Sequence, residues 1–238
     1  WEMKKNAGKK KVVLELGGNA GVVVTKNCDL DLAVKRSLVG GFAYSGQICI
    51  HAQRFFVQDE IFETFSKKFI EATKNLKRGA PEDMSTDISN MIDEENAKRV
   101  ESWVNDGVKQ GAKILCGGKR NDSFYEPTIL TDTNNKMKVC SEEVFGPVVT
   151  LEKFSSFENA VKMINDTSFG LQAGAFTDKI SEMDYAHNNV EAGGIIINDV
   201  PTFRADHMPY VGVKDSGLGR EGVKYAMMDM LEPRVLVK

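Results

Sequence analysis

Short apolar segments alternate with amphipathic segments along most of this 238-residue chain, and the alternation limits the choice of fold. The apolar segments predict strands, of which the last is expected to be buried, at residues 22–24, 55–57, 148–151, 173–176 and 195–197. Strands that alternate with helices form a mainly parallel sheet that is covered on both faces. The sequence therefore predicts an α/β fold, a three-layer αβα domain around an open, mainly parallel sheet.

Apolar residues recur at helical spacing between these strands. They predict one helix that begins near Leu30, with Asp29 or Asp31 as its N-cap, and others at residues 60–75, 94–110, 157–166 and 180–188. Further strands are expected at residues 11–16, 112–116, 125–130 and 234–237. The last of these lies at the C-terminus, where an unpaired strand would be open to pairing with another chain.

The composition is that of an ordinary globular protein, with 42% hydrophobic and 27% charged residues. The 31 basic and 34 acidic residues give a net charge of −3, so no basic excess predicts binding to nucleic acid or to an anionic membrane. No apolar run approaches the length of a membrane span. No zinc-site spacing is present, so no metal site is predicted. Widely spaced cysteines without a CxxC pair indicate reduced thiols and a cytoplasmic protein, the four being Cys28, Cys49, Cys116 and Cys140.

One of these cysteines lies in the stretch GFAYSGQICIHAQR, residues 41–54. A helical pattern runs into this stretch, Gly46 interrupts it, and Cys49 falls on the turn before the strand at residues 55–57. A thiol at such a junction is held on a fixed scaffold and can still face a cleft, which suits a nucleophile. The alternative is a buried, inert cysteine, which is common in proteins.

The Gly-Gln-x-Cys core, with Arg54 five residues after Cys49, resembles the active-site signature of the aldehyde dehydrogenase superfamily. Three further segments resemble motifs of that family in the same order: LELGGN (14–19), its general-base motif; EEVFGP (142–147), its nicotinamide-ribose motif; and MPYVGVKDSGLGRE (208–221), its C-terminal glycine-rich motif. Four ordered matches across nearly the whole chain make the resemblance specific.

The resemblance implies a reaction at Cys49. Its sulfur would attack an aldehyde, hydride would pass to a nicotinamide cofactor, and water activated by Glu15 would hydrolyse the resulting thioester to a carboxylic acid. The Cys49 backbone amide would be one donor of the oxyanion hole. The presence of Glu15 favours hydrolysis over transfer of the acyl group to coenzyme A.

The resemblance also implies the cofactor, NAD or NADP. Glu143 would accept hydrogen bonds from the nicotinamide ribose, and Phe145 would pack beside the nicotinamide. Leu16 and Gly17 are expected to complete the cofactor contacts.

By the same resemblance, residues 1–18 are the end of a coenzyme-binding half, residues 19–209 form the catalytic thiol domain, and residues 210–238 form a glycine-rich segment with an oligomerisation strand. The chain begins at Trp1 and reaches Glu15 almost at once. We therefore expect a fragment of a longer enzyme, inactive or weakly active alone. In full length the enzyme is expected to be a homodimer or homotetramer.

The expected substrate is a small aldehyde. The segment after residues 195–197 corresponds to a loop at the family's substrate entrance, and here it carries Arg204 and His207. An arginine offers a planar fork of donors that matches an anionic group. The lactaldehyde- and phosphonoacetaldehyde-type branches of the family resemble this loop. The alternative is that Arg204 pairs with Asp206 or another surface acid and contacts no substrate.

Two other functions remain open at the level of sequence. A thiol hydrolase could use His51 as the base for Cys49, because residues two apart in an extended segment share a face. The chain could also be a non-enzymatic structural or binding protein that uses this fold.

Overall fold

A computed structural model describes residues 1–238. Its centre is a seven-stranded sheet with the strand order β11-β10-β2-β3-β8-β7-β4. All neighbouring strands are parallel except β4, which is antiparallel to β7 at one edge. The strands are β2 (Ala20–Val24), β3 (Ala52–Gln58), β4 (Lys113–Cys116), β7 (Thr128–Thr131), β8 (Val148–Phe154), β10 (Gln172–Phe176) and β11 (Gly194–Ile197).

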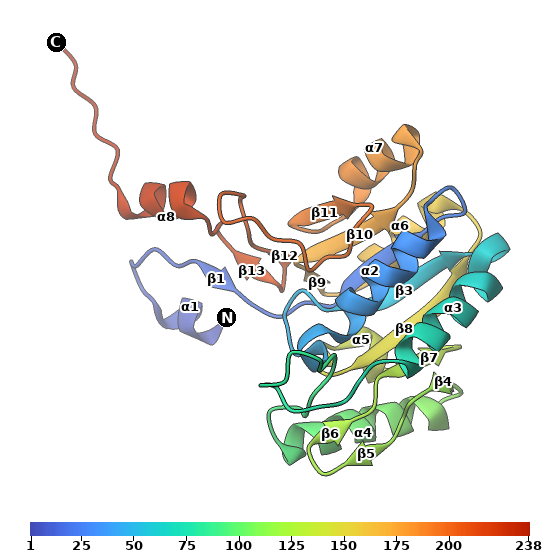
Figure 1. Cartoon of the computed structure of the whole chain (residues 1–238). Helices are drawn as coiled ribbons and strands as arrows, with labels where there is room; N and C mark the ends of the chain where they lie inside the picture. The colour runs from blue at the N-terminus through green and yellow to red at the C-terminus, as the bar shows by residue number, and fades with distance from the viewer.

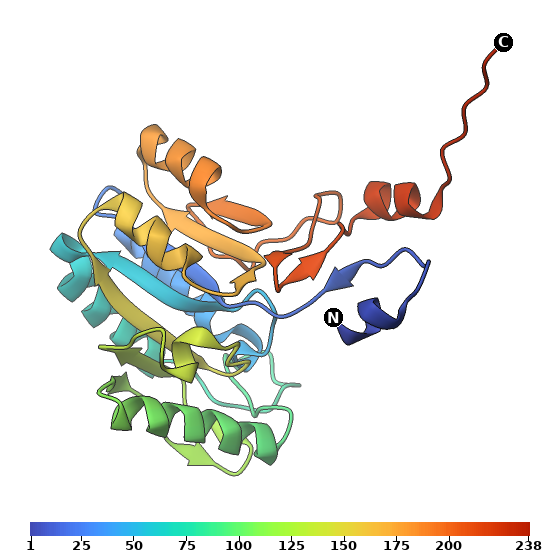
Figure 2. The ribbon, with the colours of Figure 1, turned by 180° about the vertical axis from the view of Figure 1, so that it is seen from behind.

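Helices cover both faces of this sheet, as Figures 1 and 2 show from opposite sides. Helices α2 (Leu30–Phe42) and α3 (Phe62–Lys74) pack together on one face, and a short 3-10 turn, η2 (Asp59–Ile61), precedes α3. The other face carries α4 (Glu94–Lys109), α5 (Lys138–Ser141), α6 (Phe157–Asn165) and α7 (Ile180–Asn189). The prediction of a three-layer α/β domain is confirmed.

Burial explains why the apolar segments form the middle of the sheet. Every residue of β2 is buried, because β2 lies between β10 and β3 and has helices on both faces. A strand in this environment is apolar throughout rather than alternating. Asp29 caps α2 by accepting a hydrogen bond from the Leu32 backbone N–H at 3.0 Å, which settles the choice between the two predicted caps.

Three strand predictions need correction. Strand β11 is half-buried rather than buried, because it is the edge strand and has only β10 beside it. The segment 125–130 is divided between β6 (Phe124–Tyr125) and β7, since Pro127 offers no N–H for a continuous ladder. Only two residues of segment 11–16 form a strand, β1 (Leu14–Glu15).

Three two-stranded sheets surround the main sheet. Strand β1 pairs with β13 (Gly217–Leu218), and β9 (Phe169–Gly170) pairs with β12 (Val213–Lys214), so the glycine-rich C-terminal segment lies against the N-terminal segment. The third sheet is a hairpin of β5 (Arg120–Asn121) and β6. Contacts between distant parts of the sequence thereby join the two ends of the chain.

The terminal segments extend to one side of the domain (Figure 1). They include α1 (Glu2–Asn6) and α8 (Val223–Met230). The predicted strand at residues 234–237 is absent: residues 231–238 have no sheet partner and are exposed. This prediction was wrong for the single chain, because an apolar segment forms a strand only where a neighbouring strand satisfies its backbone groups.

Aromatic packing joins α3 to the sheet and to α2. The Phe69 ring is fully buried, with ring centroids 5.4 Å from Phe55, 5.5 Å from Phe65 and 6.0 Å from Phe42. These contacts cross three elements, so removing this ring leaves a cavity that no single helix shift can fill.

We predict that Phe69→Ala lowers the free energy of unfolding by about 3–5 kcal/mol, measured by urea denaturation. Phe203→Ala is the control, since Phe203 is 49% exposed, and should cost less than about 1 kcal/mol. Equal small losses in both variants would show that the aromatic contacts do not hold this face together.

Candidate active site

Three of the four recognised motifs lie immediately before three adjacent parallel strands. Residues 14–19 precede β2, Cys49 precedes β3, and residues 142–147 precede β8. The strands begin side by side, with Ala20 opposite Ala52 and Arg54 opposite Thr150. Since parallel neighbours have their amino ends at the same edge, the topology brings the three motifs together.

The chain approaches Cys49 through an unusual backbone. After α2, the 3-10 turn η1 (Ala43–Gly46) contains three consecutive left-handed residues, Tyr44, Ser45 and Gly46, with φ of 53°, 56° and 69°. The Ser45 hydroxyl holds this turn by donating to the Ser89 carbonyl at 2.7 Å. Such backbone is costly outside glycine and is concentrated at functional sites.

Cys49 is half-buried, and its Sγ lies 3.7 Å from the Tyr210 hydroxyl. The pKa of the thiol is raised to about 11, mainly by burial and also by the neighbouring carboxylates of Glu15 and Glu143, against an opposing effect of the Tyr210 hydroxyl. The thiol is therefore protonated at neutral pH. Its backbone N–H donates to no backbone carbonyl and is free to act on a bound group.

Strand β1 holds Glu15 opposite Gly217, and one carboxylate oxygen, Oε1, is buried without a hydrogen-bond partner. Ser216 fixes the next residues: its carbonyl accepts from the Leu16 N–H at 3.0 Å, and its hydroxyl donates to the Gly17 carbonyl at 2.7 Å. The base motif is thus positioned by the C-terminal glycine-rich motif.

Glu143 lies against the two glycines of the base motif. Its Oε1 accepts a hydrogen bond from the Gly18 N–H at 2.9 Å, and its Oε2 would be 2.5 Å from a Cβ at Gly17. A Cβ at Gly18 would lie 2.2 Å from the Cys49 carbonyl oxygen. The absence of side chains at these glycines therefore allows the three motifs to touch. Burial raises the pKa of Glu143.

Two buried amides hold the segment that carries Glu143. Asn19 Nδ2 donates to the carbonyls of Cys140 and Glu142 at 3.0 and 2.8 Å. Gln53 Nε2 donates to Val139 and Glu142, at 3.0 and 2.8 Å, and its Oε1 accepts from the Val144 N–H. These bonds fix the loop between α5 and β8 relative to β2 and β3.

Arg54 is buried and ties the two central strands to α6. Its guanidinium donates to the Asn19 carbonyl and to the carbonyls of Met163 and Ile164 at the end of α6, at 2.9–3.3 Å. Desolvation lowers its pKa to about 10, so it remains charged at neutral pH. All hydrogen-bond partners of this charge are backbone carbonyls, and none is a carboxylate or the thiol. Arg54 therefore has a positioning role.

The remaining predicted cofactor residues lie beside Glu143. Phe145 is 39% exposed and has a φ of 45°, a left-handed value that turns the chain sharply before β8. Leu16 and Gly17 lie between Glu15 and the Gly18 N–H that Glu143 contacts. The structure thus brings all four predicted cofactor residues to one edge.

His51 makes no hydrogen bond to the thiol. Its Nε2 bonds the Gly41 carbonyl at 2.9 Å, its Nδ1 has no partner, and burial lowers its pKa to about 4. A histidine that serves as base for Cys49 would need a hydrogen bond to the sulfur. The alternative of a Cys-His hydrolase is not favoured.

Arg204 and His207 lie on the predicted loop but in different surroundings. Arg204 Nη2 is 3.1 Å from Glu221 Oε2, and the guanidinium stacks 4.2 Å from the Tyr210 ring centroid. Arg204 therefore has a surface acid as partner, yet it covers the ring whose hydroxyl faces Cys49. His207 is exposed and borders a groove at α8 with Val223 and Met227.

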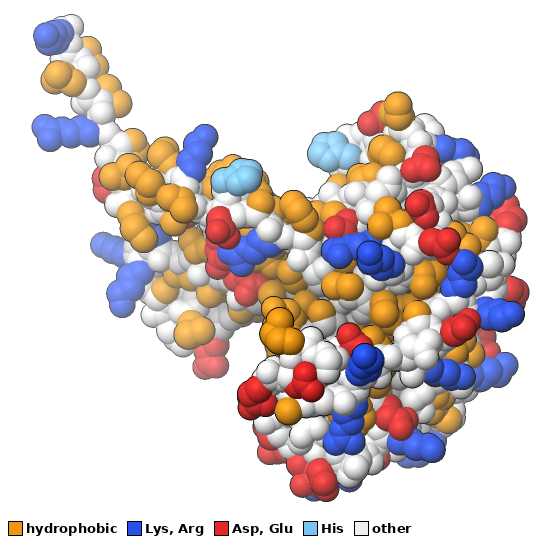
Figure 3. Space-filling view, viewed as in Figure 1, with side chains coloured by type: hydrophobic (Ala, Val, Ile, Leu, Met, Phe, Trp, Pro, Cys, Tyr) orange, Lys and Arg blue, Asp and Glu red, His pale blue; other side chains and the backbone are white.

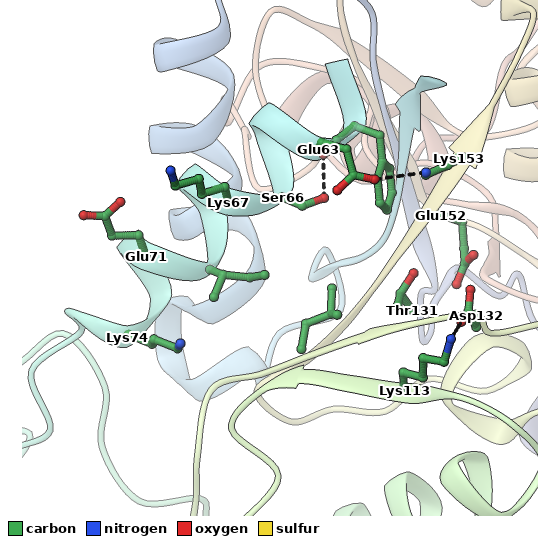
Figure 4. A pocket seen from close by; sticks show the side chains of 13 residues that line it. Glu63, Ser66, Lys67, Glu71, Lys74, Lys113, Thr131, Asp132, Glu152 and Lys153 are labelled. Carbon is green, nitrogen blue, oxygen red and sulfur yellow. Dashed lines mark hydrogen bonds and ion pairs between the residues drawn. The ribbon is translucent and has the colours of Figure 1, made fainter. Parts of the chain in front are cut away.

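A large open groove lies elsewhere in the molecule. It has a volume of about 860 Å³ and lies between α3 and strands β4, β7 and β8. Figure 4 shows that its walls carry charged side chains paired with one another, Lys153 with Glu63 and Lys113 with Asp132, at 3.1 and 2.9 Å. No cysteine or histidine lines it, so size alone would misplace the active site.

Neither a metal site nor a membrane-spanning helix is found. The structure has no group of three or more His, Cys, Asp or Glu side chains that could bind a metal ion. None of its helices combines the length and the apolar content needed to cross a bilayer.

The sequence reasoning assigned no role to several residues that build the site: Asn19, Gln53, Tyr210 and Ser216. All four are buried polar side chains with partners far away in sequence. Their positions inside or beside the recognised motifs were the only available signal. What each side chain contacts depends on the packing of strands that the sequence does not place.

Residues 2–236 match the aldehyde dehydrogenase family, and the chain belongs to it. The sequence is 45% identical over 235 residues to the 3-sulfolactaldehyde dehydrogenase of Priestia megaterium, covering 99% of this chain and 49% of that protein. It is 41% identical over 233 residues to the lactaldehyde dehydrogenase of Methanococcus aeolicus, covering 98% and 50%.

Solved structures agree with this assignment. Aldehyde dehydrogenase 21 of Physcomitrella patens, in complex with the reaction product succinate, is 48% identical, with a TM-score of 0.98 and coverage of 100% of this chain and 50% of that one. The glyceraldehyde-3-phosphate dehydrogenase of Methanocaldococcus jannaschii, complexed with NADP, is 40% identical, with a TM-score of 0.93 and coverage of 96% and 50%. The chain spans about half the length of these relatives. The predicted resemblance is confirmed.

The site predicts that removing the charge of Glu15 makes Cys49 more reactive. Glu15 raises the pKa of the thiol, so Glu15→Gln should lower that pKa and increase the thiolate fraction below pH 11. A shift of about one unit changes this fraction about tenfold, partly offset by a less nucleophilic thiolate, for a net gain of about threefold. Alkylation by iodoacetamide at pH 9, followed by peptide mass spectrometry, measures the rate.

Glu142→Gln is the matched control, because Glu142 is the exposed neighbour of Glu143 and offers only its backbone to the site. It should leave the rate unchanged. A slower or unchanged rate in Glu15→Gln would show that Glu15 does not act on the thiol.

Proposed function

We propose that this chain supplies the catalytic residues of an NAD(P)-dependent aldehyde dehydrogenase that oxidises an aldehyde to a carboxylic acid. The observation that carries the proposal is the meeting of Cys49, Glu15 and Glu143 at Gly17 and Gly18. The site thus combines the Cys49 thiol with two carboxylates. Glu15 can accept a proton, and Glu143 can accept hydrogen bonds from the two hydroxyls of a ribose.

The cofactor fits this edge of the sheet. Glu143 uses one carboxylate oxygen on Gly18 and retains the other as an acceptor for ribose hydroxyls. The Phe145 ring is exposed enough to pack on a planar group. Bound NAD or NADP would supply an acceptor for the hydride that leaves the substrate carbon.

The first step forms a carbon–sulfur bond. The Cys49 proton passes to Glu15 or to water, and the sulfur attacks the aldehyde carbon to give a thiohemiacetal. The free Cys49 N–H is placed to donate to the resulting oxyanion. Loss of hydride from the same carbon then leaves a thioester on Cys49.

The second step cleaves the thioester. Glu15 removes a proton from water, the hydroxide adds to the acyl carbon, and the carbon–sulfur bond breaks to release the acid and restore the thiol. The buried Glu15 oxygen without a partner supports this role, because an orphaned carboxylate oxygen readily accepts a hydrogen bond from water.

This mechanism predicts different defects in two variants of the full-length protein. Glu15→Gln should give a burst of reduced cofactor near one equivalent and then stop, because acylation proceeds without deacylation. Cys49→Ala should give no burst. Rapid-mixing absorbance measures both.

Cys28→Ala is the control for loss of a half-exposed thiol outside the site, and it should retain full turnover. A burst in Cys49→Ala would refute the assignment of the nucleophile. Absence of a burst in a folded Glu15→Gln would mean that Glu15 is also required for acylation.

For the substrate we propose a small aldehyde with an anionic or hydroxylated far end. Arg204 is held over Tyr210, one side chain away from the thiol, and a carboxylate, Glu221, already pairs with it. A guanidinium in this position could release Glu221 and bind a substrate anion, or it could bind both groups at once. The relatives named for sulfolactaldehyde and lactaldehyde support this class. His207 is the weaker contact, since it faces α8.

Arg204→Ala in the full-length protein should lower kcat/KM for an anionic aldehyde by at least about tenfold, because a charge-assisted hydrogen bond contributes about 1.5–3 kcal/mol. A neutral aldehyde of the same size should be nearly unaffected. Arg220→Ala is the control, since Arg220 is exposed and bonds only the Gly219 carbonyl. Equal losses for both aldehydes would show that Arg204 supports the loop and does not recognise the substrate.

Oligomerisation is proposed for the apolar C-terminal arm. Figure 3 shows hydrophobic side chains gathered along α8 and the tail, at the side of the domain. Large exposed apolar patches are rare on monomers, so a second copy of the chain is the proposed partner, in a homodimer or homotetramer. The exposed residues are Val223, Met227, Met228, Met230, Leu231, Val235, Leu236 and Val237.

The predicted division into residues 1–18, 19–209 and 210–238 is kept as a proposal. The pairing of β1 with β13 supports treating the two terminal pieces as neighbours that together border the thiol domain. The four cysteines are free thiols, which supports a cytoplasmic location.

A further inference from the structure

We infer that Tyr210 is a catalytic residue: its hydroxyl donates a hydrogen bond to the Cys49 sulfur and stabilises the negative charge that develops when the thiol loses its proton. This inference rests on the proposed function, because it assigns a role within the first chemical step. It adds a neutral donor to a site in which the other nearby groups, Glu15 and Glu143, are carboxylates.

The geometry fixes the hydroxyl at the sulfur. The Tyr210 Oη lies 3.7 Å from Cys49 Sγ, within the range for a hydrogen bond to sulfur, and the residue is only 3% exposed. The Tyr210 backbone is paired with Glu221 by two hydrogen bonds, Tyr210 N to Glu221 O at 3.2 Å and Glu221 N to Tyr210 O at 2.6 Å. Arg204 stacks on the ring and bonds the Glu221 side chain. The ring is therefore held from its backbone and from one face.

The two partners of the sulfur have opposite characters. The Glu15 carboxylate can only accept a hydrogen bond, whereas the Tyr210 hydroxyl can also donate one to a lone pair of the sulfur. When the S–H bond breaks, the proton passes to Glu15 or to water and the electron pair stays on sulfur, 3.7 Å from the Tyr210 hydroxyl that can donate to it. No external oxidant or reductant enters this step.

Tyr210 itself stays protonated. Burial and the proximity of Cys49 and Glu15 raise its pKa well above the usual range, so it does not become a competing anion. A hydroxyl beside a thiol could in principle act as donor or acceptor, but once the sulfur is charged only the donor role remains.

The test is the pH dependence of Cys49 alkylation in Tyr210→Phe, which keeps the ring and removes only the hydroxyl. Iodoacetamide rates are measured on the full-length protein between pH 8 and 11.5 by peptide mass spectrometry. We expect the midpoint to move from about 11 to beyond the upper end of this range, and the rate at pH 9 to fall about threefold, since a tenfold smaller thiolate fraction is partly offset by higher nucleophilicity. Glu15→Gln shifts the same midpoint in the opposite direction.

Two controls separate this effect from loosening of the fold. Tyr44→Phe removes a hydroxyl from a tyrosine that is 79% exposed in the same motif, and it should leave the profile unchanged. Cys28, whose pKa burial also raises to about 11, is an internal reference in every sample. If Tyr210→Phe opened the structure, the midpoints of Cys49 and Cys28 would both fall toward that of a free thiol.

An upward shift at Cys49 alone supports the inference, and an unchanged or lower midpoint overturns it. The assay uses neither cofactor nor aldehyde, so its result is independent of the burst experiment. A failed burst in the full-length protein with a positive alkylation result would refute the proposed reaction and leave the hydrogen bond intact. The reverse pair of results would refute only the role of Tyr210.

Discussion

The parallel pairing of β2, β3 and β8 is the constraint on which the site depends. Because these strands start at the same edge, the residues just before them are brought together, even Gly18 and Glu143, which are 125 positions apart in sequence. In many open α/β sheets the ligand lies at the carboxyl ends of the strands. Here the thiol and both site carboxylates lie at the amino ends, so the turns that lead into the strands carry the chemistry.

Close contact between the motifs at this edge requires two glycines, which have no side chain, and two buried amide side chains. Gly17 and Gly18 leave room for Glu143 and for the Cys49 carbonyl, and Asn19 and Gln53 then lock the loop by hydrogen bonds to its carbonyls. A Cβ at either glycine would overlap an atom of the neighbouring motif. The glycines therefore allow the motifs to approach one another, and the amide side chains hold them in that position.

The electrostatics of the site follow from this packing. A half-buried thiol between carboxylates stays protonated at neutral pH. Its reactivity therefore depends on a group that accepts the proton and on a hydrogen-bond donor that stabilises the negative charge on the sulfur. At the sulfur, Glu15 is the proton acceptor and Tyr210 is the hydrogen-bond donor. The buried cation nearby, Arg54, is occupied by backbone carbonyls and holds strands in place.

The fold class, most helix boundaries and the identity of the central motifs could be predicted from the sequence, because these depend on local periodicity and on residue order. Three contacts could be seen only in the folded chain: the Tyr210 hydroxyl lies at the Cys49 sulfur, His51 bonds the Gly41 carbonyl, and Arg204 pairs with Glu221. The half-buried position of β11 at the edge of the sheet and the absence of a strand partner for residues 234–237 were likewise seen only there. These outcomes depend on which distant segments lie side by side, a property of the strand order that no local pattern contains.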